Sequence, residues 1–141
     1  MANSTERRGG CLCGAVHLIA KSDGNGVEAC HCDMCRRWGG GPFMAIDAGT
    51  DVSIDGAENV SVFDSSDWAE RGFCRTCGSH LFYRLKQTGR YIVPAGVFGG
   101  EDGLVLEHQL FIDRKPGYYA FANDTENLTG EEVFAKFAPP G

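Results

Sequence analysis

The sequence is poor in basic residues and has no long hydrophobic run. It carries 13 Lys and Arg against 19 Asp and Glu, which gives a formal net charge of −6. Because binding to nucleic acids draws most of its affinity from clustered Lys and Arg, this deficit argues against a DNA or RNA partner. No stretch approaches the about 18 apolar residues of a membrane span, and no apolar segment follows Arg7 and Arg8 to make a secretory signal. We therefore expect a cytoplasmic protein without nucleic-acid or membrane partners, whose thiols stay reduced.

The chain also lacks a linker rich in proline or serine, a block of like charge and an internal repeat. Its mass of 15.2 kDa predicts that about two-thirds of the surface of the extended chain is buried on folding. That suits one domain with a real hydrophobic core. We expect a disordered N-terminus over residues 1–8, a single domain over residues 9–138 and a short tail that ends Pro139-Pro140-Gly141.

Glycine is plentiful, and signals for helices are scarce. The 20 glycines do not repeat in triplets, which excludes collagen and indicates many tight turns. Short segments of alternating or continuous apolar residues predict β-strands. They cover residues 15–20, 43–46, 51–55, 59–63, 79–84, 91–95 and 104–112. One short helix is expected over residues 33–38, and the capping box Thr129-Gly-Glu-Glu132 predicts a helix of two turns after it. The predicted fold class is therefore mainly β with few short helices.

The seven cysteines are an odd number, so they cannot all form internal disulfides. They fall into three close groups: Cys11-Leu-Cys13, Cys30-His-Cys32-Asp-Met-Cys35 and Cys74-Arg-Thr-Cys77. Cysteines one or two residues apart rarely have the geometry of a relaxed disulfide, whereas a turn can direct both sulfurs toward one ion. Soft thiolates in a reduced compartment select zinc or an iron–sulfur centre. The pattern favours metal binding over disulfides and over unliganded thiols.

Glycines after two of the groups suggest how seven thiolates divide. Gly14 follows the first group and Gly78 follows the third, and glycine there can adopt a positive φ so that backbone N–H groups of the turn point at sulfur. The two groups then resemble matched zinc knuckles. Their four cysteines predict a closed structural zinc site: Cys11, Cys13, Cys74 and Cys77.

The middle group keeps three cysteines, Cys30, Cys32 and Cys35. Three protein ligands leave the fourth position of a zinc ion open, as in catalytic zinc sites that bind water or a substrate thiolate. Zinc there would lower the pKa of a bound thiol and hold it as a nucleophile. Arg36 and Arg37 follow directly and would offset the negative charge of zinc with three thiolates.

A histidine as fourth ligand of this second site is the alternative. The candidates are His17, His31, His80 and His108. His31 is the weakest of them because both of its sequence neighbours already direct their side chains at the metal. For any single histidine, a hydrogen-bonded core or surface role remains the competing interpretation.

Three segments together resemble one family. Residues 9–16 (GGCLCGAV), residues 30–43 (CHCDMCRRWGGGPF) and residues 71–79 (RGFCRTCGS) are similar to the glutathione-dependent formaldehyde-activating enzyme (GFA) family, which includes the centromere-protein-V-like proteins. The resemblance spans residues 9 to about 120 and implies small antiparallel sheets in a β-tent arrangement held by zinc. It also implies two Zn²⁺ ions, one held by four cysteines of the first and third groups and one by the three cysteines of the middle group.

The resemblance implies a carbon–sulfur lyase that, in reverse, adds formaldehyde to the thiol of glutathione. The metal at Cys30, Cys32 and Cys35 would bind the glutathione thiolate, so a Ser-His-Asp or paired-carboxylate arrangement is not required, and the sequence displays neither. Where the family tends to show histidine, a basic residue and tryptophan, this chain has His108, Lys115 and Tyr118.

The first hypothesis is thus a zinc enzyme acting on a small-molecule thiol, with glutathione as the leading candidate. Arg37, Trp38 and Phe43 are the residues expected to bind substrate in the pocket wall, with packing as an equal alternative for both aromatic residues. The rival hypothesis is a non-catalytic zinc-stabilised binding module, in which the middle cysteines merely fold a loop. A redox or metal-buffering role for these cysteines is a third. No oligomeric state is predicted.

Overall fold

The computed structural model describes residues 5–22, 24–99 and 103–137. Within these ranges the protein consists of two sheets, two α-helices and three short 3₁₀-helices. The predicted mainly β class with few short helices is confirmed. Residues 1–4, residue 138 at the end of the predicted domain and the predicted tail at residues 139–141 lie outside the described ranges. Among the described residues, no helix is long and apolar enough to cross a membrane.

The smaller sheet has the strand order β1-β2-β5 and is antiparallel throughout. Its strands are β1 (Thr5–Gly10), β2 (His17–Ser22) and β5 (Val52–Asp55). The expectation of disorder over residues 1–8 is wrong for residues 5–8, which form most of β1. This strand contains no large apolar residue, so its sequence carried no strand signal, and pairing with β2 holds it in place instead.

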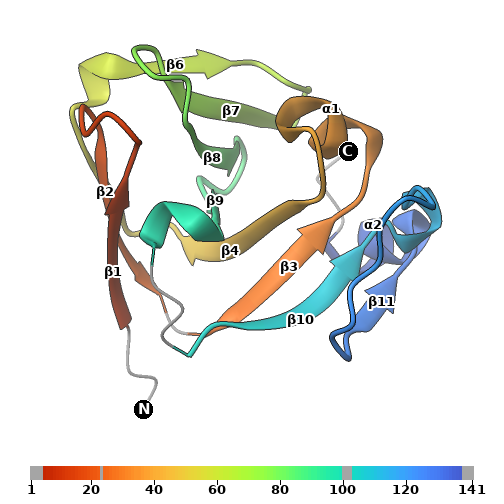
Figure 1. Cartoon of the computed structure of the whole chain (residues 1–141). Coiled ribbons are helices and arrows are strands. Elements are labelled where there is room, and N and C mark those ends of the chain that lie inside the picture. Colours follow the sequence, from red (N-terminus) through yellow and green to blue (C-terminus); the bar gives the residue numbers. More distant parts are fainter. Residues whose placement is uncertain (1–4, 23, 100–102, 138–141) are drawn as a thin grey trace.

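The larger sheet has eight strands in the order β11-β10-β3-β4-β9-β8-β7-β6. Two of its pairings, β10 with β3 and β10 with β11, are parallel, and the others are antiparallel. The strands are β3 (Gly26–Cys30), β4 (Phe43–Gly49), β6 (Val60–Phe63), β7 (Ala69–Cys74), β8 (His80–Leu85), β9 (Tyr91–Pro94), β10 (Val105–Leu110) and β11 (Glu126–Leu128). In Figure 1 the smaller sheet stands at the left and β11 at the right.

The two α-helices are α1 (Asp33–Gly39) and α2 (Gly130–Phe137), and both were predicted. The capping box before α2 is confirmed: the Thr129 N–H donates to Glu132 Oε1 at 2.8 Å, and the Glu132 N–H donates to Thr129 Oγ1 at 3.2 Å. The 3₁₀-helices are η1 (Ala57–Asn59), η2 (Ala95–Phe98) and η3 (Ile112–Arg114). Each predicted strand also matches an observed strand, while β1, β3, β7 and β11 were not predicted.

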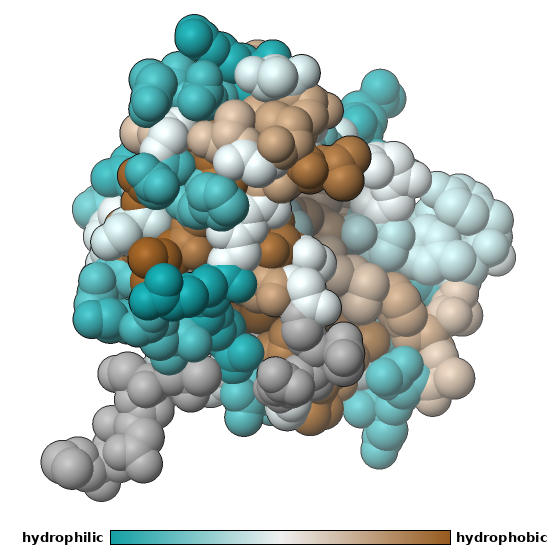
Figure 2. Space-filling view, turned by 60° about the vertical axis from the view of Figure 1, so that its left-hand side comes forward, coloured by the Kyte–Doolittle hydropathy of each residue, from teal (hydrophilic) through white to brown (hydrophobic). Residues whose placement is uncertain are grey.

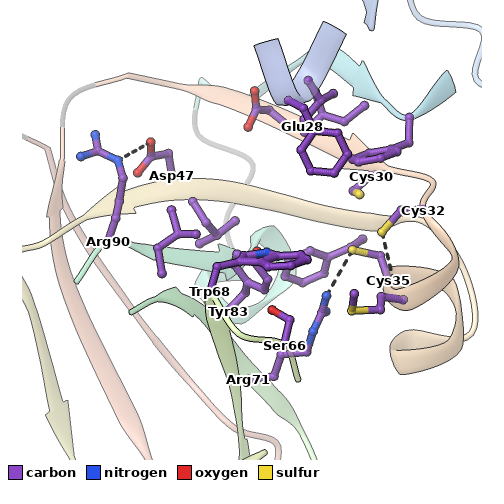
Figure 3. A pocket seen from close by; sticks show the side chains of 18 of the residues that line it. Glu28, Cys30, Cys32, Cys35, Asp47, Ser66, Trp68, Arg71, Tyr83 and Arg90 are labelled. Atoms are coloured by element: carbon purple, nitrogen blue, oxygen red, sulfur yellow. Dashed lines mark hydrogen bonds and ion pairs between the residues drawn. The ribbon is translucent and has the colours of Figure 1, made fainter. Parts of the chain in front are cut away.

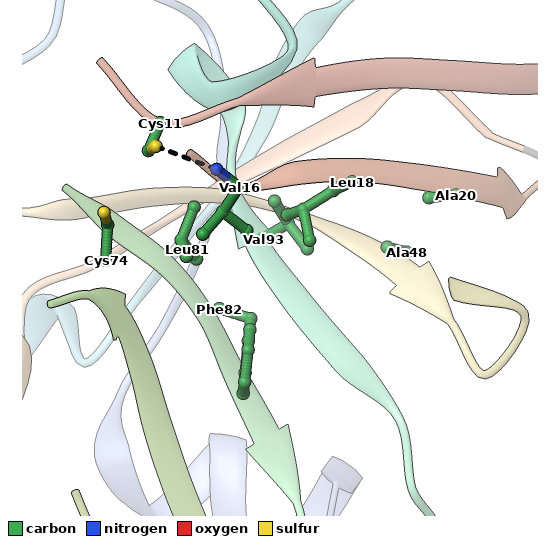
Figure 4. Packing of buried hydrophobic residues seen from close by; sticks show 9 residues of the cluster. All are labelled: Cys11, Val16, Leu18, Ala20, Ala48, Cys74, Leu81, Phe82 and Val93. Atoms are coloured by element: carbon green, nitrogen blue, oxygen red, sulfur yellow. Dashed lines mark hydrogen bonds between the residues drawn. The ribbon is translucent and has the colours of Figure 1, made fainter. Parts of the chain in front are cut away.

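The main hydrophobic core lies between the two sheets. Val16, Leu18, Leu81 and Val93 are almost completely buried there. Figure 4 shows Cys11 and Cys74 at one end of this cluster, so the first and third cysteine groups lie beside the core. On the face drawn in Figure 2, strongly hydrophilic residues gather at the top and at the lower left, with hydrophobic residues between them.

The register of the larger sheet places residues from distant parts of the chain side by side. One row of cross-strand partners runs Asp47, Ile92, Tyr83, Arg71 through β4, β9, β8 and β7. A second row runs Leu110, Cys30, Phe43 through β10, β3 and β4. Because directly paired residues point to the same side of a sheet, each row presents its side chains to one face. All seven of these residues line the cavity described below.

Candidate metal centres

The first and third cysteine groups meet in space, as the sequence predicted. The sulfurs of Cys11, Cys13, Cys74 and Cys77 all lie within 4.8 Å of one another, and the structure gives 3.6 Å between Cys11 and Cys13 and 3.7 Å between Cys13 and Cys74. Four thiolates at about 2.3 Å from a tetrahedral zinc ion are about 3.8 Å apart. The group therefore has the shape of a closed four-thiolate site.

Two tight turns hold these sulfurs. Gly14 and Gly78 have φ values of 83° and 80°, so both glycines adopt the positive φ that was predicted for them. The Val16 N–H donates to Cys11 Sγ at 3.3 Å, and the Cys77 N–H donates to Cys74 Sγ at 3.5 Å. Backbone donors pointing at sulfur favour the thiolate form that a metal requires.

Ser79 joins the two turns. Its hydroxyl accepts from the Leu12 N–H at 3.0 Å and lies 3.2 Å from Cys77 Sγ. This hydroxyl is the main cause that lowers the pKa of Cys77 to about 5. A thiol that ionises so readily is prepared for metal binding at neutral pH.

The middle group forms a second, separate cluster. The sulfurs of Cys30, Cys32 and Cys35 lie within 4.8 Å of one another, and among the described residues no histidine, aspartate or glutamate joins them within that limit. Cys30 ends β3, Cys32 precedes α1, and Cys35 lies inside α1, where it is buried. The Cys35 N–H donates to Cys32 Sγ at 3.4 Å, so the start of the helix fixes both sulfurs.

The three thiols share negative charge unequally. Contacts with the thiols of Cys30 and Cys35 lower the pKa of Cys32 to about 2. The contact with Cys32 is the largest cause that raises the pKa of Cys30. The contact with Cys30 lowers the pKa of Cys35, but the contact with Cys32 and burial outweigh it and raise that pKa to about 11. One thiolate forms easily and the others need a cation, which is the behaviour of a metal-binding group.

Arg71 is the cation that faces this cluster, and sequence reasoning missed it. Its Nη2 donates to Cys35 Sγ at 3.6 Å, as Figure 3 shows, and the residue is only 3% exposed. Its guanidinium carbon lies 4.9 Å from the ring centre of Tyr83, 5.7 Å from that of Trp38 and 5.8 Å from that of Phe43. Three aromatic faces and a thiol thus surround a charge that would otherwise be costly to bury.

Arg36 and Arg37, which were expected to offset the charge of the cluster, point elsewhere. Arg36 donates to Asp33 Oδ1 at 2.6 Å and to the His31 carbonyl at 3.0 Å, and Arg37 is exposed. The reason is helical geometry: successive residues are rotated by about 100°, so the two residues after the inward-facing Cys35 turn away from it. Arg71 on β7 lies where it can offset the negative charge of the cluster, as was expected of Arg36 and Arg37.

His31 is buried next to the cluster without being a ligand candidate. Its Nδ1 is 2.7 Å from the Tyr119 hydroxyl, and its Nε2 is 2.9 Å from Gln109 Oε1. Gln109 Nε2 then donates to Thr125 Oγ1 at 2.8 Å. Both ring nitrogens are therefore occupied, and the imidazole ties the cysteine loop to β10 and to the segment around residue 119.

The other histidines also have structural partners or lie apart. The His80 ring stacks on Trp38 with 4.6 Å between the ring centres. His108 lies 3.2 Å from Glu126 and 3.7 Å from Glu28. His17 is exposed on β2. The alternative of a histidine as fourth ligand thus finds no support in the geometry, which leaves the fourth direction open.

The three-cysteine cluster borders a cavity of about 650 Å³. All three cysteines of the middle group line it, together with Arg71. In Figure 3 the cysteines lie at one end, the Asp47–Arg90 ion pair at the other, and Trp68 and Tyr83 between them. This volume lies within the range of about 300–1,000 Å³ that is typical of small-molecule sites.

The three residues expected in the pocket wall fall in different places. Phe43 lines the cavity, opposite Cys30 in the sheet. Trp38 lies behind it, stacked on His80 and beside Arg71, so it supports the wall without forming it. Arg37 is exposed and is not part of the lining.

Comparison with known proteins places these features in a family. The profile of the family described as glutathione-dependent formaldehyde-activating enzyme matches residues 6–114. A protein of Schizosaccharomyces pombe, named as an uncharacterized lyase, is 39% identical over 129 residues, which cover 91% of this chain and 94% of that protein. The predicted kind of enzyme, a lyase of this family, is thereby confirmed.

Two further proteins are similar over shorter spans. A protein of Halomonas elongata named "Putative glutathione-dependent formaldehyde-activating enzyme" is 31% identical over 83 residues, 52% of this chain and 53% of that protein. A crystal structure of a Rhodobacter sphaeroides protein superposes with a TM-score of 0.57 at 30% identity, covering 66% of this chain and 88% of the other. The profile match spans both cysteine clusters, which could each hold a metal ion, and the strands that carry them. The chain belongs to the glutathione-dependent formaldehyde-activating enzyme family.

Proposed function

We propose that this protein is a cytoplasmic zinc enzyme that joins a thiol to an aldehyde and, in reverse, cleaves the carbon–sulfur bond of the adduct. Glutathione and formaldehyde are the leading thiol and aldehyde, as the family name suggests. The observation that carries the proposal is a cluster of three thiols that lines a cavity and has no fourth protein ligand among the described residues.

The two cysteine groups would each hold one zinc ion. Cys11, Cys13, Cys74 and Cys77 would close the coordination of the first, which ties the start of β2 to the β7–β8 turn and stabilises the fold. Cys30, Cys32 and Cys35 would hold the second. When bound there, zinc supplies a Lewis acid that favours ionisation of a substrate thiol.

The residues of the chain would act mainly by position and charge. The cavity directs a substrate thiol toward the open side of the three-cysteine cluster, and Arg71 offsets the negative charge that the thiolates gather. The sulfur lone pair of the substrate thiolate then attacks the carbonyl carbon, a carbon–sulfur bond forms, and the π pair moves onto oxygen. A proton equal to the one lost by the thiol is taken up by that oxygen.

Arg71 also offers a second donor near the reaction. Its Nη1 is buried and has no hydrogen-bond partner among the described residues. An unpaired buried donor is costly, and a carbonyl or alkoxide oxygen of the substrate would satisfy it. Arg71 is thus the residue best placed to receive the developing charge on oxygen.

Replacing one cysteine in each group tests the division. Cys74→Ser should unfold the protein or make it insoluble, because it opens a fully buried position of the four-cysteine site. Cys35→Ser should give a folded chain that retains about one zinc and loses thiol–aldehyde addition. Zinc counting, circular dichroism and proton NMR of the S–CH₂–OH group of the adduct measure the three properties. If both variants were equally folded and equally active, the assignment of the two sites would be wrong.

A further inference from the structure

The cavity beside the three-cysteine cluster is walled largely by hydrocarbon. Its apolar lining comes from α1, from β4, β8 and β9, from the residue before β7, and from the segments around β10 and α2. These residues are Met34, Phe43, Trp68, Leu85, Ile92, Leu110, Phe111, Val133 and Phe134. Formaldehyde has no carbon beyond its carbonyl, so it would leave nearly all of this surface without a partner. The lining therefore indicates a larger apolar group.

The charges at the cavity already have partners. Arg90 Nε lies 2.8 Å from Asp47 Oδ2, and Arg114 Nη1 lies 3.8 Å from Asp33 Oδ2. Arg71 contacts Cys35. Arg90 and Arg114 are thus paired with carboxylates, and Arg71 keeps only Nη1 for the reacting oxygen, whereas glutathione carries two carboxylates and an ammonium group. Charged ends are therefore better placed in solvent outside the cavity, and its interior is better suited to a neutral group.

The cavity extends away from the reacting sulfurs. Phe43, beside Cys30, and Asp47 lie four residues apart on β4, and both line the cavity. A strand advances about 3.3 Å per residue, so the apolar lining runs for about 13 Å from the cysteines to the ion pair of Asp47. That length accommodates an alkyl chain of several carbons or an aromatic ring.

We propose that the cavity binds a neutral hydrophobic group carried by the thiol–aldehyde adduct, in the first place a group on the aldehyde. This inference rests on the proposed function for the reaction and adds its substrate class. The step is unchanged: thiol RSH and aldehyde R′CHO give R–S–CH(OH)–R′, with one carbon–sulfur bond formed, the C=O π pair moved to oxygen, and the thiol proton transferred there through solvent. No oxidant or reductant is needed.

Two substrate series determine which reactant carries the group. In the first, the zinc-loaded protein adds glutathione to propanal or to hexanal, whose carbonyl groups are similarly reactive. In the second, formaldehyde is added to propanethiol or to hexanethiol. Each buried methylene is worth about 4-fold, equal to about 0.8 kcal/mol, so three methylenes predict a preference for the longer member of at least about 10-fold in kcat/KM. A preference in either series supports the proposal and shows which reactant is hydrophobic.

A binding experiment does not depend on turnover. Saturation-transfer NMR with 1-hexanol should detect binding to the wild-type protein, because this alcohol has the apolar chain without the reactive carbonyl. Val133→Trp fills the cavity from α2, where Val133 is half-buried, and should abolish this binding and the preference for the longer substrate. Val62→Trp is the matched control, since Val62 is 51% exposed on β6 outside the lining, and it should change neither.

The outcomes separate the two proposals. Equal kcat/KM along both series, together with no 1-hexanol binding to the wild-type protein, would overturn the hydrophobic substrate class while leaving thiol–aldehyde addition intact. No addition with any pair would overturn the proposed function, and the 1-hexanol result would then decide the cavity's ligand class alone. Loss of 1-hexanol binding in Val62→Trp as well would place the probe outside the cavity and would also count against the inference.

Discussion

Replacing Arg71 by methionine is expected to weaken metal binding at the three-cysteine site alone. Methionine has a similar length and no charge, so the substitution removes the cation that lies 3.6 Å from Cys35 Sγ while keeping most of the packing against Tyr83 and Phe43. The four-cysteine site contains no contact to Arg71. The two sites should therefore respond differently to one change.

The distance between Arg71 Nη2 and Cys35 Sγ gives the order of magnitude of the effect on metal affinity. Two unit charges 3.6 Å apart attract by about 4–5 kcal/mol at an effective dielectric constant of about 20. Burying the guanidinium costs several kcal/mol in return, so only part of this attraction is net. Removing such a partner of a metal ligand typically lowers metal affinity about 10–100-fold, or about 1.4–2.7 kcal/mol. We expect a loss in this range for Arg71→Met and a smaller one for Arg71→Lys, which keeps the charge but not the planar arrangement of the guanidinium donors.

Arg71→Met should affect the free energy of unfolding differently once zinc is removed. Without zinc one thiolate remains, on Cys32, but Cys35, the thiol that Arg71 contacts, is protonated because its pKa is raised to about 11. The buried guanidinium then keeps its desolvation cost with less compensation. Arg71→Met is then expected to be as stable as the wild type, or more stable, in the presence of a chelator. Competition between each site and a chromogenic zinc chelator, with thermal unfolding before and after chelation, measures both effects. Unchanged zinc affinity, or an equal loss at both sites, would refute the assigned role of Arg71.

Two further substitutions test packing around the site. In Gly72→Ala, the new Cβ would lie 2.3 Å from the ring Cζ of Phe82, so we expect unfolding in urea to show a loss of about 1–3 kcal/mol; an unchanged midpoint would contradict this close approach. Tyr119→Phe removes the hydroxyl 2.7 Å from the buried His31 Nδ1 and should cost about 1–3 kcal/mol, whereas Tyr118→Phe, at a residue 73% exposed, should cost nothing measurable. Equal unfolding midpoints for the two tyrosine variants would argue against the His31 network.

The two cysteine clusters were predictable because their geometry is local. A pair of cysteines and the glycine that follows it determine a turn, and the conformation of a turn depends little on the rest of the chain. Gly14 and Gly78 have the predicted positive φ, and the four cysteines of their groups meet. The capping box at Thr129 was predictable for the same reason, since both of its hydrogen bonds lie within three residues.

Arg71 and the cavity were not predictable in this way because they depend on register. Arg71 reaches the cysteine cluster only because β7 pairs with β8, β8 with β9 and β9 with β4, which aligns it with Tyr83, Ile92 and Asp47. A shift of one residue in any pairing would turn these side chains to the other face. The spacing of residues along the sequence does not determine this strand register. The nearby Arg36 and Arg37 therefore seemed the better candidates.

The strands that sequence reasoning missed have a related explanation. β1 carries charged and glycine residues and depends on pairing with β2, while β7 contains Glu70, Arg71 and Gly72 among its six residues. Strand propensity reflects how well side chains fit their neighbours on the sheet. A strand that carries a buried arginine is stabilised by partners distant in sequence, so its local signal is weak although the strand is central to the site.

Among the described residues, the cluster offers three sulfur ligands and has one adjacent buried cation, Arg71. Together these determine the charge of the site. With the proposed Zn²⁺ bound, three thiolates would carry a net charge of −1, which Arg71 would neutralise. A fourth cysteine would add a permanent negative charge that no other buried cation among the described residues of the lining could offset, since Arg90 and Arg114 pair with Asp47 and Asp33. In the proposed reaction, a substrate thiolate would add that charge only until its sulfur bonds to carbon, when the sulfur becomes neutral. The arrangement that would bind the thiol would thus also favour release of the adduct.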